Sequence, residues 1–125
     1  MNRSLLIVAD DPDELDILTH SFIQAGYEVI SVHHPRQALE AASFRQFQVA
    51  IVAVNLLTMG EAELLQCLKW TQHRLKCIVL SRHEYPARWA NIEGAFAWLV
   101  KPCNMALLEA TVEDAFDRAV EEVLV

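Results

Sequence analysis

Three short polar motifs in the sequence carry side chains suited to metal or phosphate chemistry. Asp10-Asp11, Ser81 and Lys101 each follow or close a short apolar run. Adjacent carboxylates repel each other, and a divalent cation such as Mg²⁺ relieves that repulsion through oxygen ligands. A lysine opposite them can hold an anion, and a serine hydroxyl can donate a hydrogen bond to one. Together these residue types predict a site for Mg²⁺ and a phosphoryl group.

Each motif alone also has an ordinary structural role. Asp10-Asp11-Pro12 suits the start of a helix, Ser81 suits a turn, and Lys101 suits an exposed surface. Their joint placement after apolar runs favours the shared site, because the carboxyl ends of parallel strands meet at one edge of a sheet.

The elements that must bring these motifs together alternate along the chain. The expected strands are residues 5–9, 27–32, 49–54, 76–81 and 95–100. The expected helices run from Pro12 to a stop at Gly26, then over 35–43, 61–70 and 86–92, and finally onward from an N-cap at Asn104. This alternation predicts an α/β fold, a doubly wound five-stranded parallel sheet flanked by five helices. The wholly apolar run 49–54 is typical of a central strand.

Composition sets further bounds on function. The 125 residues suit a single domain, 1–125, and 54% of them are apolar, which is ample for a core. The net charge of −7 disfavours nucleic acid and anionic membranes as partners. Cys67, Cys77 and Cys103 are odd in number and lack metal-binding spacing. No signal-peptide pattern follows Met1, so we expect a cytoplasmic protein.

Four stretches, in order and spacing, make the chain resemble a response-regulator receiver domain of the chemotaxis-regulator type over nearly its whole length. They are residues 6–11, 50–56, 78–81 and 98–102. The resemblance implies a flavodoxin-like (βα)5 fold and a role in two-component phosphorelay signalling. It implies a Mg²⁺ site made by Asp10, Asp11 and the backbone carbonyl of Asn55. Ser81 matches the family's switch hydroxyl, and Lys101 matches the lysine that pairs with the phosphoryl group and precedes a usually cis proline.

The chain departs from the family at the phosphate acceptor, an aspartate at the end of the third strand. Ala53 takes that position, and a methyl group neither attacks phosphorus nor ligates a metal. We therefore expect no phosphoryl transfer from a partner's phosphohistidine, and only weak Mg²⁺ binding. Ala53 is either natural or an engineered replacement. Leu57 and Gly60-Glu61, where receivers usually carry Pro and Asp-Gly, favour natural degeneracy. A third account is phosphorylation of a substitute carboxylate, Asp11 or Glu61.

Two further departures bear on partners. Trp98 replaces the Tyr or Phe that swings inward on activation in receivers, and Arg82 replaces a small residue, where it either blocks phosphate or binds an anion. We expect a non-enzymatic domain acting through protein–protein interaction, with a sensor histidine kinase or other signalling protein as partner. A homodimer would use the face of the 86–92 helix, the 95–100 strand and the C-terminal helix. Trp89 and Trp98 map to that face, and both are equally well explained as core residues.

Two other classes of function fit the sequence less well. A flavodoxin-like enzyme or cofactor binder needs a phosphate-cradling loop rich in Gly, Ser or Thr after its first strand. Asp10-Asp11-Pro12 has the opposite charge. Direct DNA binding needs a basic helix, which the sequence does not supply.

Overall fold

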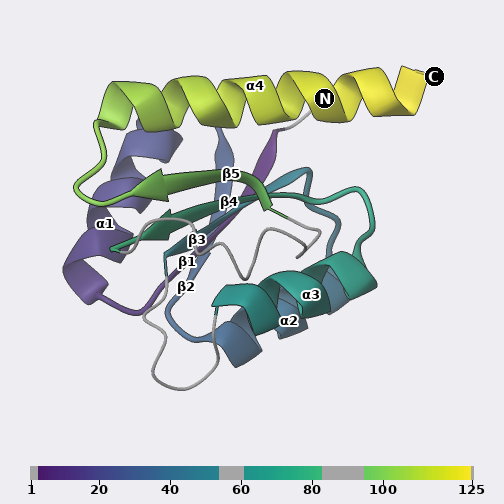
Figure 1. Cartoon of the computed structure of the whole chain (residues 1–125), viewed down its shortest axis with the longest axis horizontal. Helices are drawn as coiled ribbons and strands as arrows, with labels where there is room; N and C mark the ends of the chain where they lie inside the picture. The colour runs from purple at the N-terminus through teal and green to yellow at the C-terminus, as the bar shows by residue number, and fades with distance from the viewer. Residues whose placement is uncertain (1–2, 54–60, 83–94, 125) are drawn as a thin grey trace.

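A computed structural model of the chain describes residues 3–53, 61–82 and 95–124 (Figure 1). The elements alternate as expected: β1 (Ser4–Ala9), α1 (Pro12–Gln24), β2 (Glu28–Val32), α2 (Pro35–Phe44), β3 (Val49–Ala53), α3 (Glu61–Thr71), β4 (Lys76–Ser81), β5 (Ala95–Val100) and α4 (Met105–Leu124). The helix expected over 86–92 and the strand residue Val54 lie outside the described residues. The second strand begins at Glu28 instead of Tyr27, since the Tyr27 amide donates to the Phe22 carbonyl in the turn that ends α1.

All five strands are parallel, in the order β2-β1-β3-β4-β5. Figure 1 shows α1 and α4 on one side of the sheet and α2 and α3 on the other. The doubly wound α/β prediction is confirmed. This strand order reverses between β1 and β3, and ligands of such folds bind in the crevice beyond the carboxyl ends of the strands at that point.

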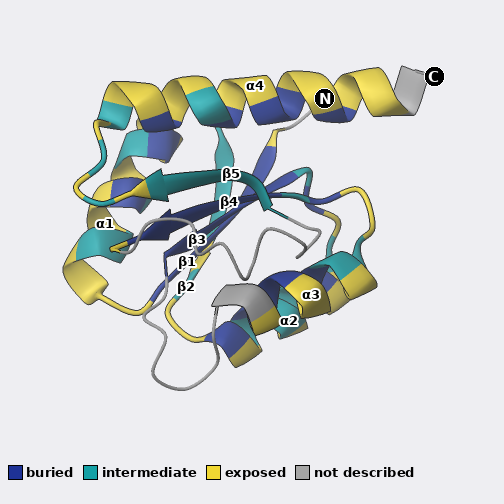
Figure 2. Cartoon of the chain, in the orientation of Figure 1, coloured by how far each residue is buried: buried dark blue, intermediate teal, exposed yellow. Residues whose placement is uncertain are grey.

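The inner strands are apolar because both of their faces are covered. Every residue of β1 and β3 is buried, as the blue strands at the centre of Figure 2 show, whereas the edge strands β2 and β5 are only partly buried. Alternate side chains enter two separate cores. Leu5, Ile7 and Ile51 join Phe22 of α1 and Leu108 of α4 in one, which we call the α1/α4 core. The other, the α2/α3 core, includes Leu6, Val8, Leu64 and Leu68.

Local sequence signals fix where α1 begins and ends and where α4 begins. The Asp11 carboxylate accepts a hydrogen bond from the Asp13 amide at 3.0 Å, and Pro12 occupies the first turn of α1. Gly26, at φ +96°, ends α1 in the left-handed region that favours glycine. Asn104 caps α4 through the Ala106 amide at 2.8 Å, as predicted.

The surface of α4 is acidic. Six acidic residues of this helix are exposed: Glu109, Glu113, Asp114, Asp117, Glu121 and Glu122. Among the residues described, no helix is long and apolar enough to cross a membrane.

Candidate functional site

The polar motifs predicted from the sequence gather at the carboxyl edge of the sheet. Ala9 and Ala53 end the neighbouring strands β1 and β3 and pair with each other in register. Asp10 and Asp11 follow Ala9 directly, and both are exposed. The acidic pair therefore stands at the point where the strand order reverses.

Ala53 occupies the end of β3 as a wholly buried residue. It is 0% exposed, and it belongs to the α1/α4 core together with Ala9 and Leu80. The side chain at this position is a methyl group. It offers no carboxylate to join those of the acidic pair that follows β1.

Ser81 and Lys101 lie on the other half of the edge. Ser81 ends β4, is 2% exposed, and pairs in register with Val100 of β5. The Lys101 amide donates to the Ser81 carbonyl at 2.7 Å, which holds the start of the β5–α4 connection against β4. The Lys101–Pro102 peptide bond is cis, as the resemblance implied.

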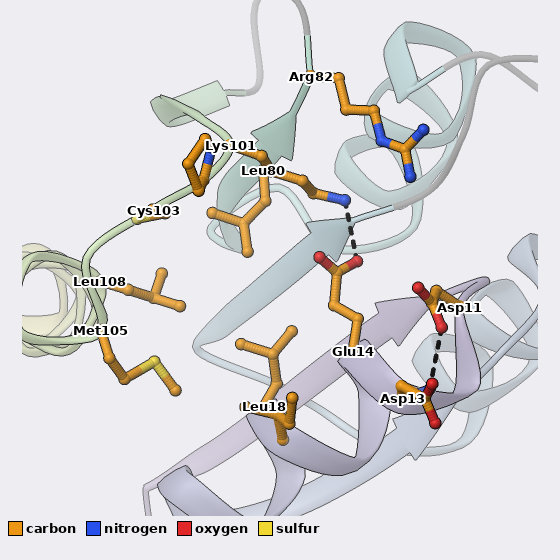
Figure 3. A pocket seen from close by; sticks show the side chains of 12 residues that line it. Asp11, Asp13, Glu14, Leu18, Leu80, Arg82, Lys101, Cys103, Met105 and Leu108 are labelled. Carbon is orange, nitrogen blue, oxygen red and sulfur yellow. Dashed lines mark hydrogen bonds and ion pairs between the residues drawn. The ribbon is translucent and has the colours of Figure 1, made fainter.

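The Lys101 ammonium has an ion-pair partner that the sequence analysis did not identify. Its Nζ lies 2.9 Å from Oε1 of Glu14, with the two side chains 22% and 25% exposed respectively. Glu14 comes from the first turn of α1, 87 positions away in the sequence. An acidic residue in the first turn of a helix is favoured by the positive end of the helix dipole, so this position by itself does not indicate a distant partner. Figure 3 shows the two side chains reaching toward each other across the gap between α1 and the β5–α4 connection.

Of three other predicted positions, the structure describes one, Trp98. Trp98 lies on β5, beside Val79 of β4, and packs half-buried against the α2/α3 core. This packing supports a core role for that ring. Asn55 and Trp89 lie outside the described residues.

The oxygen donors of the described residues make an incomplete magnesium site. Asp10 and Asp11 offer carboxylates, but Oδ1 of Asp11 already accepts from the Asp13 amide and Ala53 offers none. Over residues 3–53, 61–82 and 95–124, no cluster of three or more His, Cys, Asp or Glu side chains could hold a metal ion. Mg²⁺ usually keeps several waters and needs only one or two carboxylates, so the acidic pair suits a weakly held ion.

A cavity of about 600 Å³ opens beside the Glu14–Lys101 ion pair. It lies between α1, the end of β4 and the β5–α4 connection, and Figure 3 shows the side chains that line it. Its apolar side includes Leu18, Leu80 and Leu108. Cys103 also lines it, and burial raises the pKa of that thiol above its usual value. No local feature of the sequence predicts this cavity.

The fold and the edge motifs together are those of a response-regulator receiver domain. The family model of that domain matches residues 5–113. The chain therefore belongs to the response-regulator receiver family, and receivers are signalling modules of two-component systems.

Individual relatives and solved structures are consistent with this family. The transcriptional regulatory protein GlrR of Escherichia coli is 26% identical over 92% of this chain, which spans 26% of that relative's length. The chemotaxis protein CheY4 of Vibrio cholerae is 25% identical, with a TM-score of 0.82 over 92% of this chain and 99% of that one. The response regulator TrrA of Thermotoga maritima, whose crystal structure is a complex with Mg²⁺–BeF, is 19% identical, with a TM-score of 0.77 over 92% and 99% of the two chains.

Proposed function

We propose that residues 1–125 form a single receiver domain that does not accept phosphate and signals by binding other proteins. The single observation behind this proposal is Ala53. It ends β3 in register with Ala9, directly beside the strand that leads into the acidic pair. Phosphoryl transfer to a receiver needs a nucleophile, and the methyl group supplies none.

The other residues at the carboxyl edge hold the metal, phosphate and switch positions of the receiver site in this proposal. Asp10 and Asp11, with the backbone carbonyl of Asn55, hold Mg²⁺ weakly, and Ser81 and Lys101 keep the phosphate and switch positions. Trp98 keeps the position of the activation aromatic. With the acceptor absent, these residues perform no phosphotransfer, and the domain does not act as an enzyme. We place it in the cytoplasm, where receivers meet their kinases.

The partner is a sensor histidine kinase, another signalling protein, or a second copy of this chain. A second copy would use the face to which β5 and α4 contribute; the 86–92 helix predicted for that face lies outside the described residues. Val100 of β5 and Leu107 of α4 are 42% and 53% exposed, and such apolar groups support an interface there. Direct binding to nucleic acid or membrane forms no part of the proposal, because the net charge is −7.

Intact-mass spectrometry after incubation with Mg²⁺ and acetyl phosphate tests the proposal. The chain as it stands should gain no phosphoryl group. Ala53→Asp should gain one, and Ala53→Asn, which has the same shape without an ionisable carboxylate, should gain none. Circular dichroism should accompany each variant, because a polar side chain at this buried position destabilises the fold.

A phosphoryl group on the unaltered chain would overturn the proposal, and peptide mapping would then decide between Asp11 and Glu61 as the substitute acceptor. A folded Ala53→Asp variant that stays unmodified would show that the site has lost more than its acceptor. The binding role would then stand without the assigned phosphate and switch positions. The sequence of the gene from the source organism decides whether Ala53 is natural or engineered.

A further inference from the structure

The cavity beside Lys101 has the size of a small-molecule site. Its volume is about 600 Å³, and pockets that hold small organic ligands measure roughly 300–1,000 Å³. Three of its apolar side chains, Leu18, Leu80 and Leu108, are 5%, 3% and 1% exposed and belong to the α1/α4 core. Because the core fixes these side chains, this wall is formed before any ligand arrives.

The cavity has an apolar side and a charged side. Met105 and Ile17 extend the apolar wall outward, and Ile17 is 63% exposed although it is a large aliphatic residue. Figure 3 shows Leu18, Leu80, Met105 and Leu108 on one side and the charged side chains on the other. A ligand that fills this space would therefore need an apolar body and one polar end.

The charged side is lined by three carboxylates, Asp11, Asp13 and Glu14, and by two cations, Lys101 and Arg82. Glu14 and Lys101 pair at 2.9 Å, and Oδ1 of Asp11 accepts a hydrogen bond from the Asp13 amide, which leaves the Asp11 charge in place. Arg82 lines the cavity, is exposed, and forms no ion pair with any residue that the structure describes. In Figure 3 the Arg82 guanidinium lies at the same end as the Lys101 ammonium, and Asp13 lies at the opposite end.

We propose that this cavity binds a small amphipathic anion. The apolar body packs against Leu18, Met105 and Leu108, and a carboxylate, sulfonate or phosphate group pairs with Arg82, with Lys101 as the neighbouring cation. Arginine suits this role because its planar guanidinium binds such oxyanions through two parallel hydrogen bonds. The inference goes beyond the proposed function. It gives the domain a ligand input that needs no acceptor aspartate, and it stands whether or not Ala53→Asp can be phosphorylated.

Two matched fluorescent probes test both halves of the proposal. The first, 8-anilinonaphthalene-1-sulfonate, has an aromatic body and an anionic group. The second, N-phenyl-1-naphthylamine, has the same rings without the sulfonate. We expect saturable binding of the sulfonate at one site, and weaker binding of the uncharged amine. Near-ultraviolet circular dichroism of each variant confirms native packing, because loosely packed states also bind such dyes.

Substitutions at both sides of the cavity have matched controls elsewhere. Arg82→Gln should weaken the sulfonate about threefold to tenfold, which corresponds to the net contribution of a typical hydrogen bond, and should leave the amine unchanged. Ile17→Asp should weaken both probes. The controls are Arg118→Gln, an exposed cation on α4, and Ile23→Asp, an exposed isoleucine on α1 that does not line the cavity.

Three results would overturn the proposal. The first is absence of saturable sulfonate binding to the native chain. The second is equal affinity for the two probes with no effect of Arg82→Gln, which would remove the anionic end of the ligand. The third is loss of binding in Arg82→Gln with no loss in Ile17→Asp, which would reduce the site to an exposed cation without a cavity.

Discussion

The interior of the sheet resembles that of a receiver domain more closely than the carboxyl edge does. In the interior, β1 and β3 are buried along their whole length, and each face of the sheet is covered by one of the two cores. At the edge, Asp10, Asp11, Ser81 and Lys101 remain, but Ala53 has no carboxylate and Lys101 pairs with Glu14. The fold and the edge site therefore depend largely on different residues, so a change at the site leaves the fold in place.

Ala53 belongs to both regions. It stands at the carboxyl edge by sequence, and its side chain is part of the α1/α4 core. The same substitution that restores a carboxylate for chemistry would therefore place a charge against apolar neighbours. A receiver with aspartate at this position needs Mg²⁺ or lysine nearby to offset that cost, whereas alanine needs neither.

The largest effect on stability is expected in the interior. Phe22→Ala removes a wholly buried ring that packs edge-on against Tyr27, at 5.6 Å between centroids. It should lower the free energy of unfolding by about 3–5 kcal/mol, because a cavity is left behind. Urea unfolding followed by circular dichroism measures this change.

Phe44→Ala provides the control for that measurement. Phe44 ends α2 and is 90% exposed, so the same substitution there should change the unfolding free energy by less than about 0.5 kcal/mol. Similar losses at Phe22 and Phe44 would contradict the packing described for the α1/α4 core.

Cys77 should make the interior sensitive to alkali. The thiol lies buried on β4, and burial raises its pKa from 9.0 to about 12. In the unfolded chain the thiol ionises near its ordinary pKa, while the folded state keeps it protonated. The stabilising contribution is therefore complete below pH 9 and is lost as pH rises from 9 toward 12, at up to about 1.4 kcal/mol for each pH unit.

Unfolding in urea at pH 8, 9 and 10 measures this slope for the unaltered chain and for Cys77→Ala. The substitution should flatten the decline above pH 9, even though it lowers stability at every pH. Cys67→Ala is the control, since Cys67 is exposed and its removal should leave the decline unchanged. A decline of the same steepness in Cys77→Ala would assign it to other groups.

The interior was also the region that the sequence predicted best. The buried strands β1 and β3 could be predicted from unbroken apolar runs, because burial on both faces demands such sequence. Over the described residues, the bounds of all five strands agree with the expected ones to within a residue. The helix caps at Asp11 and Asn104 could also be predicted from the sequence, since each depends on a few adjacent residues.

The Glu14–Lys101 pair and the cavity were not predictable in the same way. Both depend on how far α1 stands from the β5–α4 connection, which is a tertiary distance between segments 87 positions apart. The only local signal for Glu14 was an acid in the first turn of a helix, which the positive end of the helix dipole already explains. Exposed Ile17 beside acidic residues is a similarly ambiguous signal.

The smallest effect is expected at the edge, from the Glu14–Lys101 ion pair. A double-mutant cycle with Glu14→Gln, Lys101→Met and the double variant should give a coupling of about 0.5–1 kcal/mol, since the side chains are only 25% and 22% exposed. The control pair, Asp114 and Arg118, is 3.9 Å apart with side chains 59% and 62% exposed, and its coupling should be near zero. Raising the salt concentration should reduce the first coupling only partly. A coupling as large as the loss expected for Phe22→Ala would show that the edge helps to hold the fold together, and the separation between stability and chemistry would then fail.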